Sequence, residues 1–421
     1  MAIHPLTLAP IYQDETIRRL SLLMNKNQPR LGDRLQIMPT EYREISVINQ
    51  LSDFAAMRDE WNQLNQRSEK GTIFSSWEWL YSWWEIYQDQ GDRELFILSL
   101  RKDGELIALA PFQILNHPKK YFPCSKQLIL IGTGETDGGL VLSEYLDLII
   151  EPGAVSHAVS TFTNYLMDKQ SQWQGSLFQQ LLNDSYLSLL FGGQNLSIQA
   201  ESKPNGFRTL IDLPETYKDY LMSLQKKKRN NITRMLTRLQ KEQDYVVDNL
   251  SDGLDPDKAI TELADLNRER RENLQQPSAF HQPNFEAFHR LVVKRLLPTN
   301  QVQIRILRIE DKPVAALYTL IDGDTMHAYQ SGFEAELGHR YALLTMMITQ
   351  EISHCIDDPR LKRFNFMYSA DENSYKLRYS AYTEPMFDQS YFPKNVRTSL
   401  HNLVHGPVKQ TIKQILKKNA A

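Results

Sequence analysis

The chain has 421 residues, of which 24% are charged and 41% are hydrophobic, and its formal net charge is −3. This length suggests two or three domains, and the charge balance excludes an overall basic protein of the DNA-binding kind. The two cysteines form no disulfide framework or metal motif, so we expect a reducing compartment and no bound metal. No run approaches the roughly 18 apolar residues of a membrane span. The N-terminus lacks a secretory signal pattern, so we expect a cytoplasmic protein.

The chain begins with a segment that has little regular pattern. Residues 1–42 contain four prolines and only weak periodicity, which predicts an N-terminal arm rather than a domain. A strand is predicted over 43–49. The spacing of apolar residues over 51–68 then predicts a helix.

The next stretch, "FSSWEWLYSWWEIY" (74–87), holds four of the six tryptophans. Ser75 and Glu78 match a capping box, so we expect a helix to begin at Ser75. Two interpretations of its indoles stay open. They belong to the core or to a domain interface, or Trp79, Trp83 and Glu85 line a cleft where an acyl chain or a sugar ring could stack.

The first half continues with strands. Two are predicted within 94–115 on either side of the Asp103-Gly104 turn. Further strands are predicted within 126–140 and 145–153, and a helix over 154–169. Turn residues in "ESKPNGF" (201–207) and "DLPET" (212–216) predict a unit boundary near 200–216.

The second half repeats this order. A long helix with one basic face is predicted over 217–245, and another helix over 258–274. Three strands are predicted within 301–333, a helix over 341–358 and a strand over 361–369. The shared order suggests a duplicated α/β unit. The "KKKR" run (226–229) either attracts phosphates of a donor, a carrier protein or lipid heads, or is a solvated helix face.

The ordered stretches resemble a known family. "FSSWEWLYSWW", "LFILSLRKDGELIALAPF", "YLDLIIEPG", "KKKRNNITRMLTRLQKE" and "FNFMYSADENSYKLRYS" are similar to two-domain acyltransferases of the GNAT superfamily, in the branch named after the cellulose-biosynthesis protein CelD. That branch is related in fold to Fem-type aminoacyl transferases. The resemblance implies an α/β fold with a mixed sheet, built from tandem GNAT-like units at 43–205 and 206–392, with the active site in the second unit.

The resemblance also implies a reaction. An acyl group would move from a thioester donor, coenzyme A or acyl carrier protein, to an amine in cell-envelope, polysaccharide or specialised-metabolite biosynthesis. No tightly bound cofactor is implied. The alternatives are a Fem-like transfer from aminoacyl-tRNA and a catalytically degenerate scaffold of an envelope-synthesis complex. Residues 393–421 form a basic amphipathic pattern, which predicts a helix that either docks on the protein or lies on the inner face of the membrane.

Two departures from the family pattern concern the donor site. Where the family has Ser-Pro-Gly before a helix that receives pyrophosphate, this chain has Gly338, His339, Arg340 and Tyr341. The two basic residues could still bind phosphate by charge. Where the family motif reads Phe-Asp-Phe, this chain has Asn365 in place of the carboxylate.

Tyr375 and Lys376 stand on the family's Tyr-Lys motif. The resemblance implies that the tyrosine gives a proton to the leaving thiolate and that the lysine binds a carboxylate or phosphate or helps to position the acceptor. Asp371 in the preceding loop and Arg378 are candidate substrate-binding residues. The alternative is that Lys376, Arg378 and Tyr379 form one solvated strand face.

His327, Tyr329 and Gln330 lie in a predicted strand of the second half. Alternation places His327 and Tyr329 on one face. His327 is the candidate general base for the attacking amine, with Tyr329 and Gln330 as substrate contacts. The alternative is a structural histidine. We find no Walker loop, no H-E-x-x-H and no G-x-S-x-G, and "GTGETDGG" (132–139) lacks the helix that a dinucleotide fingerprint requires.

Overall fold

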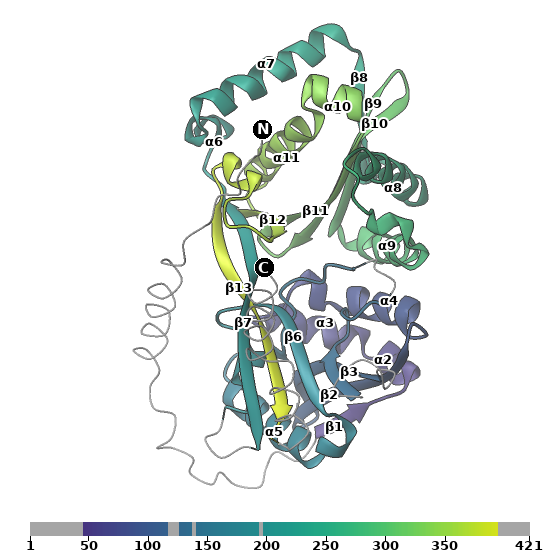
Figure 1. Cartoon of the computed structure of the whole chain (residues 1–421), viewed down its shortest axis with the longest axis vertical. Helices are drawn as coiled ribbons and strands as arrows, with labels where there is room; N and C mark the ends of the chain where they lie inside the picture. The colour runs from purple at the N-terminus through teal and green to yellow at the C-terminus, as the bar shows by residue number, and fades with distance from the viewer. Residues whose placement is uncertain (1–44, 117–125, 137–139, 193–196, 395–421) are drawn as a thin grey trace, which may run out of the picture. The chain divides into compact units, whose positions relative to one another are not determined.

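The computed structural model describes residues 45–116, 126–136, 140–192 and 197–394, in which thirteen strands form one mixed sheet (Figure 1). The α/β fold class with a mixed sheet is therefore confirmed. The predicted arm (1–42) and the amphipathic segment beyond residue 394 lie outside the described residues. None of the helices in the described ranges has the length and apolar character needed to cross a membrane.

The first half of the sheet contains β1 (Ile45–Ile48), β2 (Asp92–Lys102), β3 (Glu105–Asn116), β4 (Lys126–Leu130), β5 (Ile149–Ile150) and β6 (Gly175–Leu182). Its helices are α2 (Leu51–Ala56), α3 (Arg58–Arg67), α4 (Trp77–Tyr87) and α5 (Val155–Asp168). Strands β1 to β4 pair antiparallel in order, β5 pairs with β3, and β4 pairs with β6 in parallel.

The second half has the same pattern. Its strands are β8 (Tyr245–Asn249), β9 (Val302–Ile309), β10 (Lys312–Asp322), β11 (Thr325–Phe333) and β12 (Arg363–Ser369). Its helices are α6 (Tyr217–Ser223), α7 (Lys226–Glu242), α8 (Pro256–Asn273), α9 (Pro283–Leu296), α10 (Ala335–Tyr341) and α11 (Leu343–Asp357). Strands β8 to β11 pair antiparallel in order, and β11 pairs with β12 in parallel.

Two long strands join the halves by exchange. β7 (Ile198–Asp212) follows β6 in the chain but pairs with β12, whereas β13 (Tyr382–Pro393) follows β12 but pairs with β6. β7 and β13 pair with each other along the middle of the sheet (Figure 1). Each half thus receives its last strand from the other half, which makes the sheet continuous.

The turn predicted at "ESKPNGF" is wrong, because this segment lies inside β7. Pairing with strands on both sides outweighs the local turn signals of Pro204 and Gly206. Gly206 keeps a positive φ of 74°, and a Cβ there would lie 2.4 Å from the Tyr368 ring. The boundary predicted between residues 205 and 206 therefore falls within a strand, and the division into units stays a prediction.

Two other elements differ from expectation. The helix predicted over 217–245 is interrupted, because Leu224 has an extended backbone between α6 and α7. Of the strand predicted over 145–153, only Ile149–Ile150 pairs. Asp147 instead accepts hydrogen bonds from the backbone N–H groups of Leu148, Tyr186 and Leu187, which holds this segment as a loop.

The tryptophan helix α4 begins at Trp77, with Ser76 as its N-cap, rather than at Ser75. Glu78 takes no part in a capping box; its carboxylate accepts from Arg58 and Asn62 instead. A capping box does exist one turn earlier, between Thr72 and Ser75.

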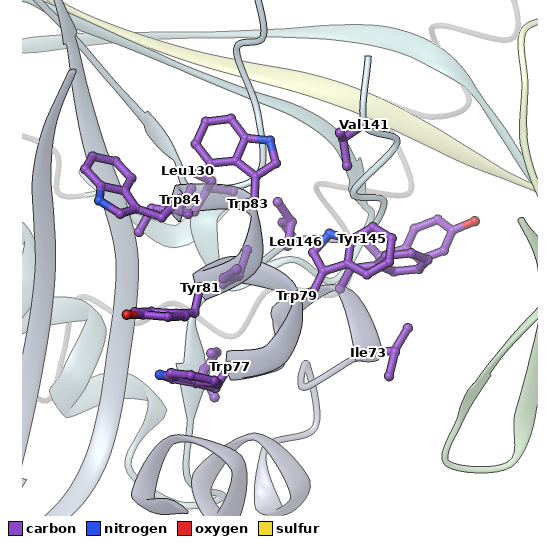
Figure 2. Packing of buried hydrophobic residues seen from close by; sticks show 14 of the residues in the cluster. Ile73, Trp77, Trp79, Tyr81, Trp83, Trp84, Leu130, Val141, Tyr145 and Leu146 are labelled. Atoms are coloured by element: carbon purple, nitrogen blue, oxygen red, sulfur yellow. The ribbon is translucent and has the colours of Figure 1, made fainter. Parts of the chain in front are cut away.

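The indoles of α4 are packed inside the protein (Figure 2). Trp77 stacks on Tyr81 at a ring separation of 4.2 Å. Trp79 lies edge-on to Phe288 of α9 and Tyr329 of β11, so the helix also joins the two halves. The N–H groups of Trp77 and Trp79 donate to Phe54 O and Ser143 Oγ, and that of Trp83 to Glu135.

Candidate active site

The parallel pair β11 and β12 separates after three residues. Its rows are Thr325 with Arg363, Met326 with Phe364, and His327 with Asn365. β11 continues to Phe333 and β12 to Ser369, but the described pairing between them ends at the last of these rows. Peptide groups on the facing edges beyond His327 are therefore outside the β11–β12 ladder, where an extended ligand could pair with them.

A cavity of about 620 Å³ lies at the paired end of these strands. Both halves contribute to its wall, through segments 69–72, 145–147 and 182–184 and through 322–325, 327, 363 and 365. Its carboxylates outnumber its cations by six to three: Glu69, Asp147, Asp184, Asp322, Asp324 and Glu384 against Lys70, Arg208 and Arg363. Each of the three cations is already paired with a wall carboxylate. The cavity is thus net acidic.

His327 is buried in the cavity wall with 4% of its surface exposed. Its Nδ1 lies 3.0 Å from Asn365 Nδ2, and its Nε2 lies 3.6 Å from Asp322 Oδ2. His327 and Tyr329 both contact the Phe74 ring, as alternation on one strand face predicts. Tyr329 is buried in the aromatic core beside Trp79, away from the cavity wall.

Asn365 is fully buried between His327 and the first half. Its Oδ1 accepts from the Met367 N–H at 2.8 Å, and its Nδ2 donates to the Tyr145 hydroxyl at 3.2 Å. Burial, and after it the charge of Glu144, holds the pKa of Tyr145 well above its ordinary value, so the phenol keeps its proton. The residue that departs from the family pattern therefore links the two halves.

Tyr375 and Lys376 lie in a short 3₁₀ helix, η8 (Tyr375–Tyr379), and not on a strand face. Lys376 Nζ donates to the carbonyl oxygens of Phe366, Met367 and Tyr368 at 2.6, 3.1 and 2.5 Å. These contacts use all three ammonium donors, which leaves none for a carboxylate or phosphate of a substrate. Tyr375 is 50% exposed.

The charge of Lys376 also acts on a carboxylate that sequence reasoning missed. Glu144 is fully buried, and its Oε1 accepts from the Tyr368 N–H at 2.8 Å. Burial raises the pKa of Glu144, an effect that Tyr145, Tyr368 and Lys376 partly offset. Burial likewise lowers the pKa of Lys376 to about 8, against the attraction of Glu144. No local sequence signal points to Glu144, because Tyr368 and Lys376 lie more than 200 residues away.

The residues predicted to bind donor phosphate do not form a loop before the helix. Gly338, His339, Arg340 and Tyr341 all lie in α10, and α11 begins only after Ala342. A Cβ on Gly338 would lie 2.1 Å from the Phe333 ring, so this glycine serves close packing.

The side chains of these α10 residues do not converge on one site. Arg340 Nη2 and the buried Tyr341 hydroxyl both contact Glu242 at the end of α7, at 2.8 and 2.9 Å. His339 is exposed.

The remaining predicted substrate contacts are dispersed. Trp79 and Trp83 are fully buried, so neither indole has a face open to a ligand. Glu85 forms an ion pair with Arg295 of α9 at 2.6 Å. The last three candidates lie outside the cavity wall: Gln330, Asp371 and Arg378.

Arg270 of α8 is a candidate that sequence reasoning missed. Its guanidinium lies over the Phe333 ring at 4.9 Å, and its Nη1 reaches Ser331 Oγ at 3.5 Å. Both contacts lie on β11 beyond His327. Burial lowers the pKa of Arg270, and the nearby Tyr375 partly offsets this. Within the described ranges Arg270 has no ion pair with a carboxylate and its Nε has no hydrogen bond, so its charge is available to an anion.

Residues 226–377 match the family described as acetyltransferase (GNAT) domain. This range includes α7 to α11, β8 to β12 and most of η8. The match makes the protein an acyltransferase, and domains of this family take acyl-CoA as co-substrate. The enzyme class predicted from the sequence is therefore confirmed.

Two solved structures are similar in fold. One is FemX, with a TM-score of 0.58 and 9% identity, covering 86% of this chain and 99% of that chain. The other is a conserved protein of unknown function from Bacteroides thetaiotaomicron, with a TM-score of 0.52 and 14% identity, covering 83% and 100%. These identities establish the fold alone. No curated protein matched the chain by sequence.

Proposed function

We propose that the protein is an N-acyltransferase of the CelD type, which moves an acyl group from a thioester donor to an amine in cell-envelope, polysaccharide or specialised-metabolite biosynthesis. One observation carries the proposal. His327 and Asn365 form the last paired row of β11 and β12, and both residues also line the net acidic cavity. A donor along the separated strands and an acceptor in the cavity would meet at this row.

The donor side is supported by the chemistry of β11 beyond His327. The pantetheine arm shared by coenzyme A and acyl carrier protein contains amides, which can pair with a strand edge as an added strand does. Arg270 beside Ser331 offers a positive charge for a phosphate of that donor. In this arrangement the half-exposed Tyr375 is the proton donor for the leaving thiolate.

The acceptor side is supported by the charge of the cavity. All three wall cations are neutralised, so the remaining carboxylates favour a positively charged amine. Asp322 is the wall carboxylate nearest to His327 Nε2, at 3.6 Å. It binds the ammonium and takes one proton from it. The amine nitrogen then forms the C–N bond as the C–S bond breaks, and the thiolate leaves with the proton from Tyr375. The new amide nitrogen gives its second proton to the Tyr375 phenolate, so the amide and the thiol are neutral and Tyr375 is restored.

The test is a thiol-release assay with acyl-CoA and acyl carrier protein donors, each offered a panel of mono- and diamines. Thiol release should require the amine, and mass spectrometry should detect the N-acyl product. If no donor and amine pair releases thiol above the rate without protein, the proposal fails.

The second candidate is the Fem-like use of aminoacyl-tRNA, and one observation favours it. Helix α7 has seven basic residues and one acidic residue among seventeen, which suits a polyanion. Transfer from aminoacyl-tRNA, lost when the RNA is digested first, would select this candidate over the thioester donor.

A further inference from the structure

The orientation of the Asn365 amide is fixed by its neighbours. Its oxygen accepts from the Met367 backbone N–H at 2.8 Å, and a backbone N–H can only donate. The amide nitrogen must therefore face the other way, toward the Tyr145 hydroxyl at 3.2 Å and His327 Nδ1 at 3.0 Å. Its two N–H groups match these two partners, because Tyr145 remains a neutral phenol that can accept through its oxygen.

This arrangement determines which nitrogen of His327 has the proton. Since Asn365 Nδ2 can only donate, His327 Nδ1 must accept, and it can accept only when it is unprotonated. In a neutral imidazole the proton is then on Nε2. Nε2 is the buried ring nitrogen that lies on the side of Asp322, without a hydrogen bond in the described structure.

We propose that Asn365 is a positioning residue that locks neutral His327 as the Nε2–H tautomer, so that His327 is a hydrogen-bond donor toward the cavity and not a proton acceptor. This differs from the general-base role expected from the sequence. A base at Nε2 needs its proton on Nδ1 and an acceptor facing Nδ1, which a carboxylate at position 365 would supply. The amide supplies the opposite.

The charged and titratable groups around His327 do not remove its preference for the Nε2–H tautomer. Asp322 faces Nε2, and the buried carboxylate of Glu144 acts on the ring from the first half. A proton on Nδ1 would direct an N–H group at the N–H of Asn365. The Tyr145 ring lies 6.4 Å from the imidazole, and its hydroxyl accepts from Asn365 Nδ2.

The local backbone of β12 also holds the Asn365 amide in this orientation. Met367, which orients the amide, has a positive φ of 62° at the irregularity where the pairing of β12 with β7 changes register. Lys376 binds the carbonyl oxygens on both sides of this residue and at the residue itself. The irregular turn of the strand therefore presents the Met367 N–H to Asn365.

The consequence for acyl transfer rests on the proposed function, whereas the tautomer does not. An Nε2–H group at the separation point can stabilise negative charge that develops on the thioester oxygen. The proton of the amine must then go to another group, and Asp322 is placed to take it.

The first experiment reads the tautomer without any substrate. Long-range ¹H–¹⁵N spectra of the full-length protein should show Nδ1 of His327 as unprotonated and Nε2 as protonated, with the signals assigned by their loss in His327→Gln. Asn365→Asp should reverse the pattern or produce an imidazolium. His289 is buried and unconnected to Asn365, so its signals should not change and serve as the internal reference. A wild-type spectrum with the proton on Nδ1 would overturn the proposal, whether or not any variant folds.

The second experiment distinguishes a hydrogen-bond donor at position 327 from a general base. His327→Leu should lower kcat by about 10²-fold or more, the usual effect of removing one donor to a developing oxyanion. His327→Gln should recover a large part of this loss, because an amide can donate but cannot act as a base. Equal losses in both variants, with unchanged melting temperatures, would overturn the donor role. Should the wild type transfer no acyl group, the proposed function fails while the tautomer measurement still stands.

Discussion

Lys376 Nζ lies 3.1 Å from the carbonyl oxygen of Met367, the residue at which β12 adopts a left-handed backbone. The ammonium thus stabilises the irregular turn of β12 and has no donor left for a substrate. Tyr375, the adjacent residue of the same motif, is half exposed and makes no such contact. The two residues of one sequence motif therefore have different environments.

We predict that Lys376→Met lowers the free energy of unfolding by about 3 kcal/mol, since buried acceptors left without donors cost roughly 1–3 kcal/mol each. Tyr375→Phe is the matched control and should leave the melting temperature unchanged while lowering kcat, as expected for loss of an acid. Urea denaturation followed by circular dichroism measures the first effect. A fully stable Lys376→Met protein with a raised KM would instead support a substrate-binding lysine.

Arg270 is predicted to contribute more to donor binding than Arg340. Its charge has no carboxylate partner in the described structure, whereas Arg340 is paired with Glu242 at 2.8 Å. Arg270→Gln should weaken acyl-CoA binding by about 10-fold to 100-fold, which corresponds to a lost charge-assisted contact of roughly 1.5–3 kcal/mol. Calorimetry with a non-hydrolysable donor analogue measures this. Arg340→Gln is the comparison, and a larger effect there would favour the phosphate site predicted from the sequence.

We predict that the burial of His289 makes the folded protein less stable in acid. It is fully buried among aromatic rings, neither ring nitrogen has a hydrogen bond in the described structure, and burial lowers its pKa to about 3. The unfolded histidine has a pKa near 6.5, so between about pH 6.5 and 3 the unfolded state binds more protons than the folded state. Stability should fall as the pH decreases through this range, at up to about 1.4 kcal/mol per pH unit from this group.

The check compares urea unfolding of wild type and His289→Phe at pH 7 and pH 5. The wild type should lose more stability than the variant between these pH values. His281→Gln, at a half-exposed histidine near Glu272, should behave as the wild type does. The same pH dependence in His289→Phe and wild type would show that His289 is not the cause.

Local signals predicted those elements whose geometry is determined locally. The Asp103-Gly104 turn is an example, since both residues have the positive φ that such a hairpin turn needs. The shared strand order of the two halves is also predicted, because apolar runs and turn residues repeat. The strand β7 is not predicted by local signals, because its turn residues are outweighed by pairing with β12 and β13, which lie about 160–190 residues further along the chain.

The candidate site was predicted only in part for the same reason. His327 and Tyr329 were placed on one face by alternation, and both contact Phe74. The consequence of Asn365 could not be predicted, because it depends on Tyr145, which is 220 residues away. The full use of the Lys376 donors depends on the irregular backbone of β12, which no sequence pattern indicated.

The last prediction concerns how the acceptor is chosen. Asp322 is the wall carboxylate beside His327 Nε2, and its side chain is 23% exposed, so an ammonium can reach it. Asp322→Asn keeps the shape and removes the charge. KM for the amine should rise about 10-fold to 100-fold, the equivalent of roughly 1.5–3 kcal/mol for a charged hydrogen bond, while donor binding stays the same.

The matched control is Asp371→Asn, an exposed aspartate outside the cavity wall whose Oδ1 contact to the Asn373 N–H an asparagine can keep. It should leave the amine KM unchanged. The amine panel is measured by thiol release at saturating donor. Because the cavity is net acidic even without Asp322, the variant should still prefer amines to alcohols of the same shape. An amine KM for Asp322→Asn equal to that of the wild type would place the acceptor elsewhere. If kcat/KM is unchanged in Asp322→Asn but reduced in Asp371→Asn, the acceptor binds at the loop before η8.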